Sequence, residues 1–193
     1  PSFYNVPPID RGEERKKLGL APDVPTCVVL FGGFGAPMMT KIVERLQPMA
    51  GKLQLILMCG HNDKLAAKLR SIGGGLRIHV EGFTREVPRF MQMGDFMVGK
   101  PGPGSVSEAI HMGLPVIVEQ NSWTMPQERY NADWLREQGV GVVLSSFKDI
   151  AGAVDKLLTP GELEKYRQRA AQIHNRAIFE IPDILQQVLD RGA

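Results

Sequence analysis

Six short apolar runs, separated by stretches of helical periodicity, constrain the fold of this chain more than any other feature. They read TCVVLF at 26–31, LQLILMC at 53–59, LRIHV at 76–80, DFMVG at 95–99, PVIVE at 115–119 and GVVL at 141–144. Nearly continuous apolar runs of this length are typical of strands that are covered on both faces, as in parallel sheets. We therefore predict an α/β fold: a doubly wound, Rossmann-like parallel sheet of about six strands with helices on both faces.

The connecting stretches predict the helices and the limits of the domain. Helices are expected near 37–50, 62–72, 85–93, 105–112, 126–138 and 147–158. Gly113 and Gly139 stand where C-terminal caps belong, and the tail from Pro160 onward is predicted as two more helices broken at Pro182. We interpret 1–25, with its prolines, as a linker and 26–193 as one domain with C-terminal helices.

Charge and composition exclude several classes of protein. A net charge of +2, with basic residues mixed among acidic ones, gives no reason to expect nucleic acid as a partner. No run approaches the roughly 20 apolar residues that cross a bilayer, and the first residues lack the order of a signal peptide. Cys27 and Cys59 lie in predicted interior strands, where free thiols suit a reducing compartment. We expect a soluble, cytoplasmic chain.

No metal site or catalytic triad is expected. The histidines share no metal-ligand spacing with each other or with the cysteines, and no nucleophile elbow is present. The chain starts PSFYN without an initiator methionine, which we interpret as a cut inside a longer protein.

The segment GKPGPGS at 99–105 leaves a predicted buried strand and enters a predicted helix. Ligands of this fold bind beyond the carboxyl ends of the strands. Gly102 and Gly104 let the backbone approach an anion, the free N–H groups at the helix start favour phosphate oxygens, and Lys100 adds a full charge. Because a proline follows Lys100, this is not a Walker A loop. We predict a phosphate-binding loop.

Ser105 and Glu108 leave two interpretations of this loop open. With the spacing S-x-x-E they are able to form a capping box, and the glycines would then only shape a turn. If Glu108 faces a ligand instead, its carboxylate accepts hydrogen bonds from two adjacent ribose hydroxyls. The two roles compete for one side chain.

The glycine-rich segment GGFGAP at 32–37 also joins a predicted strand to a helix. It resembles a dinucleotide fingerprint, but Met38 stands at the third glycine position. No acidic residue closes the second strand, where 60–62 reads GHN. NAD binding is therefore a weak hypothesis.

A third constellation opens the predicted helix at 126–138. Gln127 and Asn131 lie four residues apart and share a helix face, so their amides, with Glu128 beside them, are able to present donors and acceptors to sugar hydroxyls. The alternative is a polar first turn that only faces solvent.

Taken together, these motifs resemble family 28 glycosyltransferases of the GT-B architecture, and among them the monogalactosyldiacylglycerol synthases and diacylglycerol glucosyltransferases. The resemblance covers about 1–158. It rests on landmarks in one order: Pro1-Ser2-Phe3, LFGGFG, MCGHNDKLAAKL, VEGF, KPGPGSVSEAIHMGLPVIV and Pro-Gln-Glu-x-x-Asn. Several motifs in order are more specific than any single one.

The resemblance implies that this chain is a donor-binding domain that holds a UDP-sugar, UDP-galactose or UDP-glucose, with no other cofactor. The uracil would lie against Gly82-Phe83 and the 60–62 loop, Glu108 would hold the ribose, the helix start and the 33–35 loop would hold the diphosphate, and 127–131 would read the hexose. Motifs and resemblance together assign Gly33, Phe34, Gly35, Gly60, His61, Asn62, Gly82, Phe83, Lys100, Gly102, Gly104, Ser105, Glu108, Gln127, Glu128 and Asn131 to this ligand.

The resemblance further implies an inverting, metal-independent hexosyltransferase as the full-length protein. Its catalytic base and its lipid acceptor, diacylglycerol, would belong to an N-terminal acceptor domain absent from this chain, so this chain alone would bind donor without turnover. Peripheral contact with a membrane surface is expected of the whole protein, at the plastid envelope if its source is a plant or alga.

Three questions stay open at this point. Segment 119–125, beside the expected hexose site, differs from the plant galactolipid synthases, which leaves galactose and glucose as alternatives. The chain also fits a nucleotide-sugar-binding subunit of a split transferase that docks on a membrane partner. Half of a nucleotide-sugar epimerase is the third possibility.

Overall fold

A computed structural model of the chain describes residues 3–191. Pro1 and Ser2, which belong to one landmark and to the predicted linker, lie outside the described residues, as do the last two residues of the predicted domain. Six parallel strands form one sheet in the order β3-β2-β1-β4-β5-β6. They are β1 Thr26–Leu30, β2 Gln54–Met58, β3 Arg77–Glu81, β4 Phe96–Gly99, β5 Val116–Glu119 and β6 Gly141–Leu144. The predicted fold class and all six predicted strands are confirmed.

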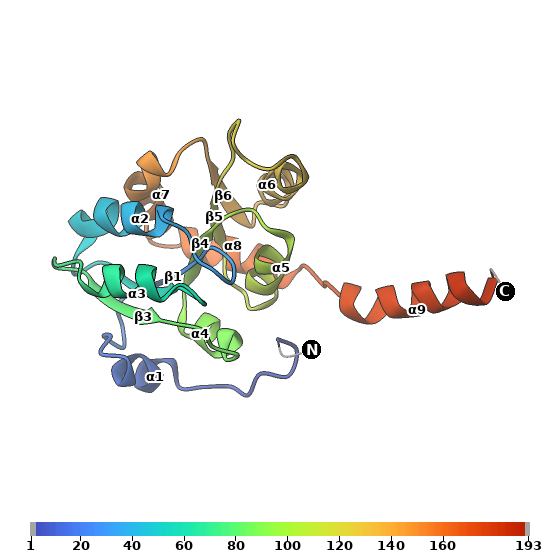
Figure 1. Ribbon diagram of the computed structural model, residues 1–193, viewed down its shortest axis with the longest axis horizontal. Coiled ribbons are helices and arrows are strands. Elements are labelled where there is room, and N and C mark those ends of the chain that lie inside the picture. The colour runs from blue at the N-terminus through green and yellow to red at the C-terminus, as the bar shows by residue number, and fades with distance from the viewer. Residues whose placement is uncertain (1–2, 192–193) are drawn as a thin grey trace.

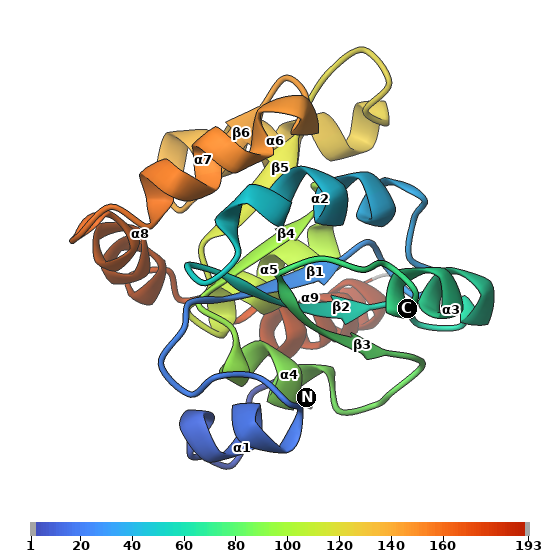
Figure 2. The same ribbon diagram turned by 90° about the vertical axis from the view of Figure 1, so that its left-hand side faces the viewer.

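Helices cover both faces of this sheet (Figures 1 and 2). The helices of the described residues are α1 Arg11–Lys17, α2 Met38–Leu46, α3 Asp63–Arg70, α4 Val87–Met93, α5 Pro103–His111, α6 Pro126–Gln138, α7 Ile150–Leu157, α8 Glu162–Ala171 and α9 Ala177–Arg191, with short 3-10 turns at Gln47–Met49 and Phe147–Asp149. Helix α9 does not cover the sheet, and none of its residues is buried. One apolar core lies under α2, α3 and α7, and a second lies under α4, α5 and α6.

The two cores explain why the strands are continuous apolar runs. Successive side chains of a strand point to opposite faces, so Cys27 and Val29 enter the first core and Val28 enters the second. All three are fully buried. With both faces covered, the middle of β1 is apolar, and its one polar residue, Thr26, is buried with its N–H and hydroxyl hydrogen-bonded.

The chain ahead of β1 is attached to the domain through one buried carboxylate. Asp95, just before β4, accepts hydrogen bonds from Arg11 and Arg15 of α1, each at 2.7 Å, and from Arg167 of α8 at 2.8 Å. The backbone N–H of Thr26 donates to the same carboxylate at 2.7 Å. Composition alone predicted only a linker over 1–25, whereas residues 11–17 form a helix held against the body of the domain.

The predicted break at Pro182 is wrong, although two helices do follow Pro160. The chain breaks at 172–176 instead, and Pro182 lies inside α9. The side chain of Asn175 accepts a hydrogen bond from the N–H of Ala177 at 3.0 Å, as N-cap residues do. Pro182 is the sixth residue of α9, and the helix continues through it although a proline there removes one helical hydrogen bond and crowds the preceding turn.

The predicted glycine caps are confirmed. Gly113 has φ 71° and Gly139 has φ 62°, and both follow the last turn of a helix. Helix α9 extends away from the rest of the chain (Figure 1). Across residues 3–191, the helices are too short or too polar to pass through a bilayer.

Replacing Asp95 by asparagine should destabilise the fold. Burial on its own would raise the pKa of Asp95, but Arg15, the Thr26 N–H, Arg11 and Arg167 outweigh it and lower that pKa. The ionised carboxylate therefore stabilises the fold at pH values above the ordinary aspartate pKa. This contribution is lost as the pH falls through the lowered pKa of Asp95 in the folded protein. We expect D95N to cost about 3–5 kcal/mol at pH 7, because it leaves the buried Arg15 without its counter-charge.

Urea unfolding at pH 7 and at acid pH measures this effect. The difference in the free energy of unfolding between wild type and D95N should be smaller at acid pH. E13Q is the matched control, because Glu13 forms only an exposed pair with Lys16, and solvent screens such a pair. Equal stability of D95N and wild type at pH 7 would contradict the assigned role.

Candidate functional site

A cavity of about 750 Å³ opens at the carboxyl edge of the sheet. This volume is within the range of small-molecule sites, and the place is where doubly wound folds bind ligands. The predicted site residues that line it are Gly33, Gly60, Gly82, Phe83, Lys100, Gly102, Gly104, Ser105, Glu108 and Glu128. Loops that are distant in sequence thus meet around one space.

Helix α5 points its N-terminus at this cavity. It begins at Pro103, two residues before the predicted start, with Gly102 as the N-cap and no capping side chain. Proline suits the first helical position because its φ is already fixed and no N–H is lost there. The next two residues, Gly104 and Ser105, line the cavity, and amides of a first turn have no partner within their helix. Two donors are available to an anion.

The capping-box interpretation of Ser105 and Glu108 is wrong. Ser105 is the third residue of α5 and its hydroxyl donates to the Gly102 carbonyl at 3.3 Å, so it is not the N-cap. Glu108 lies one turn further on, half-buried in the cavity wall, and burial raises the pKa of its carboxyl. A carboxylate partly removed from water is a strong acceptor for ligand hydroxyls.

The loops after β1 and β2 are locked together beneath the cavity. The N–H of His61 donates to the carbonyl of Gly33 at 2.9 Å. Gly60 has φ 57°, and a side-chain carbon there would lie 2.0 Å from the Gly33 carbonyl oxygen. Asn62 caps α3 and also donates from its side chain to the Phe34 carbonyl at 3.1 Å. Gly60 thus allows the close backbone approach between the two loops.

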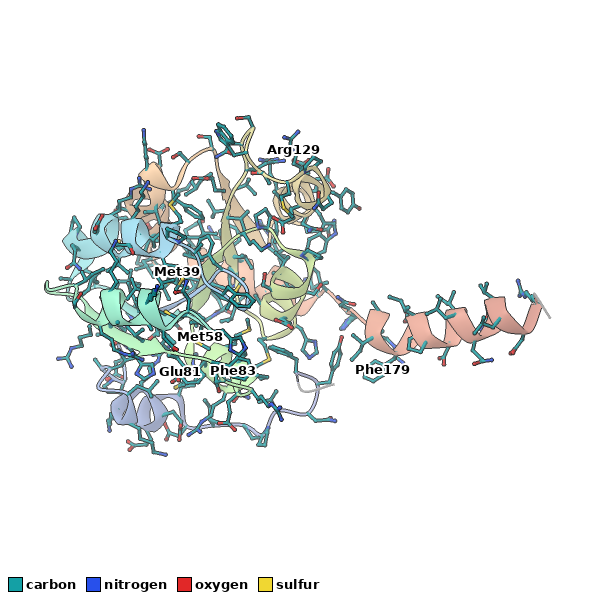
Figure 3. All side chains as sticks on the ribbon, viewed as in Figure 1. Met39, Met58, Glu81, Phe83, Arg129 and Phe179 are labelled. Atoms are coloured by element: carbon teal, nitrogen blue, oxygen red, sulfur yellow. The ribbon has the colours of Figure 1, made fainter. Side chains whose placement is uncertain are left out.

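Phe83 lines one side of the cavity, and other aromatic rings pack behind it. The His61 ring stacks on Phe83 with centroids 3.9 Å apart, and Phe34 lies 5.7 Å from His61. Phe83 lines the cavity beside Met58, and both are labelled in Figure 3. Phe34, Gly35, His61 and Asn62 do not line the cavity themselves; they support the loop that does.

Helix α6 holds the phosphate-loop candidate from the other side. Lys100 Nζ pairs with Glu128 Oε1 at 2.8 Å, and Asn131 donates from Nδ2 to the Pro101 carbonyl at 2.8 Å. Gln127 is exposed, and neither it nor Asn131 lines the cavity. The structure therefore brings Glu128 to the site, uses Asn131 to fix the loop, and leaves Gln127 outside.

Several lining residues were missed from the sequence. Thr84, Arg85 and Pro88 follow β3, a loop that the carboxyl-edge rule does single out, so Arg85 was a readable signal as a cation near that edge. Phe3 reaches the cavity from the N-terminal segment. No local pattern predicts such a long-range return.

Across residues 3–191, no group of three or more histidine, cysteine, aspartate or glutamate side chains is arranged to hold a metal ion.

Comparison with known proteins identifies the architecture and the family. The model of the glycosyltransferase family 28 C-terminal domain matches residues 26–188. The chain is 33% identical over 204 residues to the chloroplastic monogalactosyldiacylglycerol synthase of Spinacia oleracea, covering 98% of this chain and 38% of that protein. It is 31% identical to the chloroplastic monogalactosyldiacylglycerol synthase 1 of Arabidopsis thaliana, covering 94% of this chain and 35% of that protein.

Solved structures share the fold at low sequence identity. Acinetobacter baumannii MurG superposes with a TM-score of 0.73 at 17% identity, covering 93% of this chain and 54% of that one. Anabaena Alr3699/HepE in complex with UDP and glucose gives 0.68 at 17% identity, covering 98% of this chain and 54% of that one. The chain thus spans about half of these structures and less than two fifths of the curated relatives.

Replacing Gly60 by alanine should damage the fold around the site. The added carbon would clash with the Gly33 carbonyl and would be strained at positive φ, so we expect a loss of about 2 kcal/mol or more. G152A is the control, because that site in α7 is open and alanine favours a helix by up to about 1 kcal/mol. Thermal unfolding compares them; a G60A protein as stable as G152A would contradict the locked-loop geometry.

Replacing Glu108 by glutamine should stabilise the ligand-free protein at pH 7. Since burial raises the Glu108 pKa, its ionisation costs the fold free energy as the pH rises through that raised value. Glutamine does not ionise, so the melting temperature of E108Q should exceed that of wild type at pH 7. At a pH well below the ordinary glutamate pKa, the two melting temperatures should be equal. Calorimetric melting across this range checks the sign; E108Q melting below wild type at pH 7 would refute it.

Proposed function

This chain belongs to glycosyltransferase family 28, and on that premise we propose that it binds the UDP-sugar donor of an inverting hexosyltransferase that acts on a lipid. One observation carries the proposal: the first-turn amides of α5 and the carboxylate of Glu108, one turn later, face the same cavity. This pairing suits a ligand that joins a diphosphate to a ribose.

The diphosphate in this proposal accepts hydrogen bonds from the amides of Gly104 and Ser105. Positive partial charge at the helix start and the nearby Lys100 ammonium favour its negative charge. Support comes from the position of all three residues in the cavity wall. Gly33, in the opposite loop, leaves room for the phosphates because it carries no side chain.

The nucleoside lies toward the third strand in this proposal. Glu108 accepts from the two ribose hydroxyls, and the uracil lies against the backbone of Gly82 and Phe83. Gly82 and Phe83 both line the cavity, and the His61 ring stacks on Phe83. The similarity to Alr3699/HepE, solved with UDP and glucose, supports a uridine nucleotide as the ligand.

The hexose lies toward α6, beside Glu128, in this proposal. Glu128 is the α6 side chain that lines the cavity, and its carboxylate is an acceptor for sugar hydroxyls. UDP-galactose and UDP-glucose differ at one hydroxyl, and the names of the curated relatives favour galactose.

Transfer requires stabilisation of the leaving UDP. The acceptor hydroxyl, deprotonated by a base, attacks the anomeric carbon while negative charge grows on the β-phosphate. Fixed N–H dipoles at α5 and the Lys100 charge offset that growth in the place of a divalent cation. We assign no catalytic base to this chain and expect it in an acceptor half, since the relatives are much longer.

The acceptor in this proposal is a lipid, diacylglycerol by analogy with the relatives' names. The acceptor half would contact the membrane peripherally, at the plastid envelope if the source is photosynthetic. Helix α9 exposes Ile184, Leu185 and Val188, and we propose that these side chains pack on that half.

Titration of the whole protein that carries this chain with UDP tests the proposal. We expect binding in wild type and at least about tenfold weaker binding in E108Q, since charge-assisted hydrogen bonds are worth about 1.5–3 kcal/mol. Wild-type affinity should fall as the pH drops through the raised Glu108 pKa, because the protonated carboxyl no longer accepts from both hydroxyls. E108Q should lack this pH dependence.

E137Q provides the control, because Glu137 is exposed on α6 and does not line the cavity. Its UDP affinity should equal that of wild type. Absence of UDP binding in wild type, or equal weakening in E108Q and E137Q, would defeat the assignment.

A further inference from the structure

Two opposite charges inside the cavity neutralise each other in the ligand-free structure. Lys100 Nζ lies 2.8 Å from Glu128 Oε1, and both residues line the cavity. The lysine side chain is 45% exposed, whereas that of the glutamate is only 9% exposed. The ion pair thus joins a half-exposed cation to a carboxylate that is nearly removed from water.

This ion pair lies over the start of α5. A side-chain carbon placed at Gly102, the N-cap, would be 3.4 Å from Lys100 Cε, 3.4 Å from Ser105 Oγ and 3.6 Å from Glu128 Oε1. A helix N-terminus beside a lysine is a favourable place for an anion. In the ligand-free protein, the anion at this place is the protein's own carboxylate.

We propose that Glu128 is an internal competitor of the donor diphosphate. The diphosphate takes Lys100 from Glu128, and the freed carboxylate turns to accept hydrogen bonds from the hexose hydroxyls. The inference rests on the proposed donor site and adds a property that such a site need not have. Lys100 binds the diphosphate of the donor and Glu128 binds its hexose, after the ion pair between them has opened.

The loop backbone does not depend on this ion pair. Asn131 holds the Pro101 carbonyl at 2.8 Å from the same helix that carries Glu128. Opening the pair therefore requires movement of the lysine side chain, which has a long flexible stem, while the loop keeps its place.

The exchange favours the complete donor over UDP. A nearly buried carboxylate that loses its cation is costly unless other groups replace the lost contact. Hexose hydroxyls replace it when UDP-hexose binds, but UDP alone leaves Glu128 without that compensation. Once the hexose has been transferred, Glu128 regains Lys100 and weakens the hold on UDP. The pair thus discriminates between substrate and product.

Glu128→Gln tests this exchange by calorimetry on the whole protein with UDP, UDP-galactose and UDP-glucose. Glutamine has nearly the same shape but does not compete for Lys100. We expect UDP to bind about threefold to tenfold more tightly, while the preferred UDP-hexose binds more weakly by a similar factor, each fold-change being about 0.6–1.4 kcal/mol. The two ligands thus shift in opposite directions.

E108Q is the matched control. Ribose is common to all three ligands, so E108Q should weaken them by one shared factor. If E128Q unfolds, Glu128→Asp replaces it: the charge remains, but the carboxylate is drawn back from Lys100. The same opposite shifts, at smaller size, are then expected.

Two results would overturn the inference and are distinguishable. If wild type binds UDP but the folded Glu128 variant shifts UDP and UDP-hexose in the same direction, the pair is only structural and the donor site stands. If wild type binds neither ligand, the proposed function fails, and the inference fails with it.

Discussion

The pairing of β1 with β4 at the centre of the sheet is the constraint from which the site follows. Leu30 and Gly99 are partners at the carboxyl ends of these strands, and a side-chain carbon at Gly99 would lie 2.4 Å from the Leu30 carbonyl oxygen. After β1 the chain leaves toward α2 on one face, and after β4 it leaves toward α5 on the other. A crevice opens between the diverging loops, with the α5 N-terminus as one wall.

The sequence predicted this arrangement because its signals are local. Continuous apolar runs identify strands covered on both faces, and parallel strands collect the following loops at one edge. Gly33, Gly35, Gly60, Gly102 and Gly104 could therefore be predicted in loops at one edge of the sheet, and the family resemblance added their assignment to one ligand. The sequence does not reveal why residue 60 must be glycine. Only the structure shows that the Gly33 carbonyl occupies the space that a side chain at position 60 would need.

The contacts that sequence reasoning missed are side-chain pairs between distant segments. Asp95 gathers two arginines of α1 and one of α8, and nothing in the composition of 1–25 indicates a buried carboxylate 80 positions away. Glu128 was assigned to a sugar, but its pairing with Lys100 depends on how α6 meets the loop after β4. Pro182 misled because proline usually breaks or kinks a helix, whereas here α9 continues through it and the chain breaks at 172–176 instead.

We propose that the exposed apolar side chains of this chain face the acceptor half of the proposed transferase. Within residues 3–191, the large exposed apolar residues lie either on α9 or near the carboxyl edge: Phe34, Phe83, Trp123, Met125 and Tyr130. Arg129 tethers the loop around Trp123 by donating hydrogen bonds to the Ser122 and Thr124 carbonyls. The Trp123 side chain is nevertheless 92% exposed. A rigid loop that presents a large apolar ring to solvent is suited to contact. An acceptor half that closes over this edge would cover these side chains and exclude water from the departing diphosphate, where fixed N–H dipoles act most strongly.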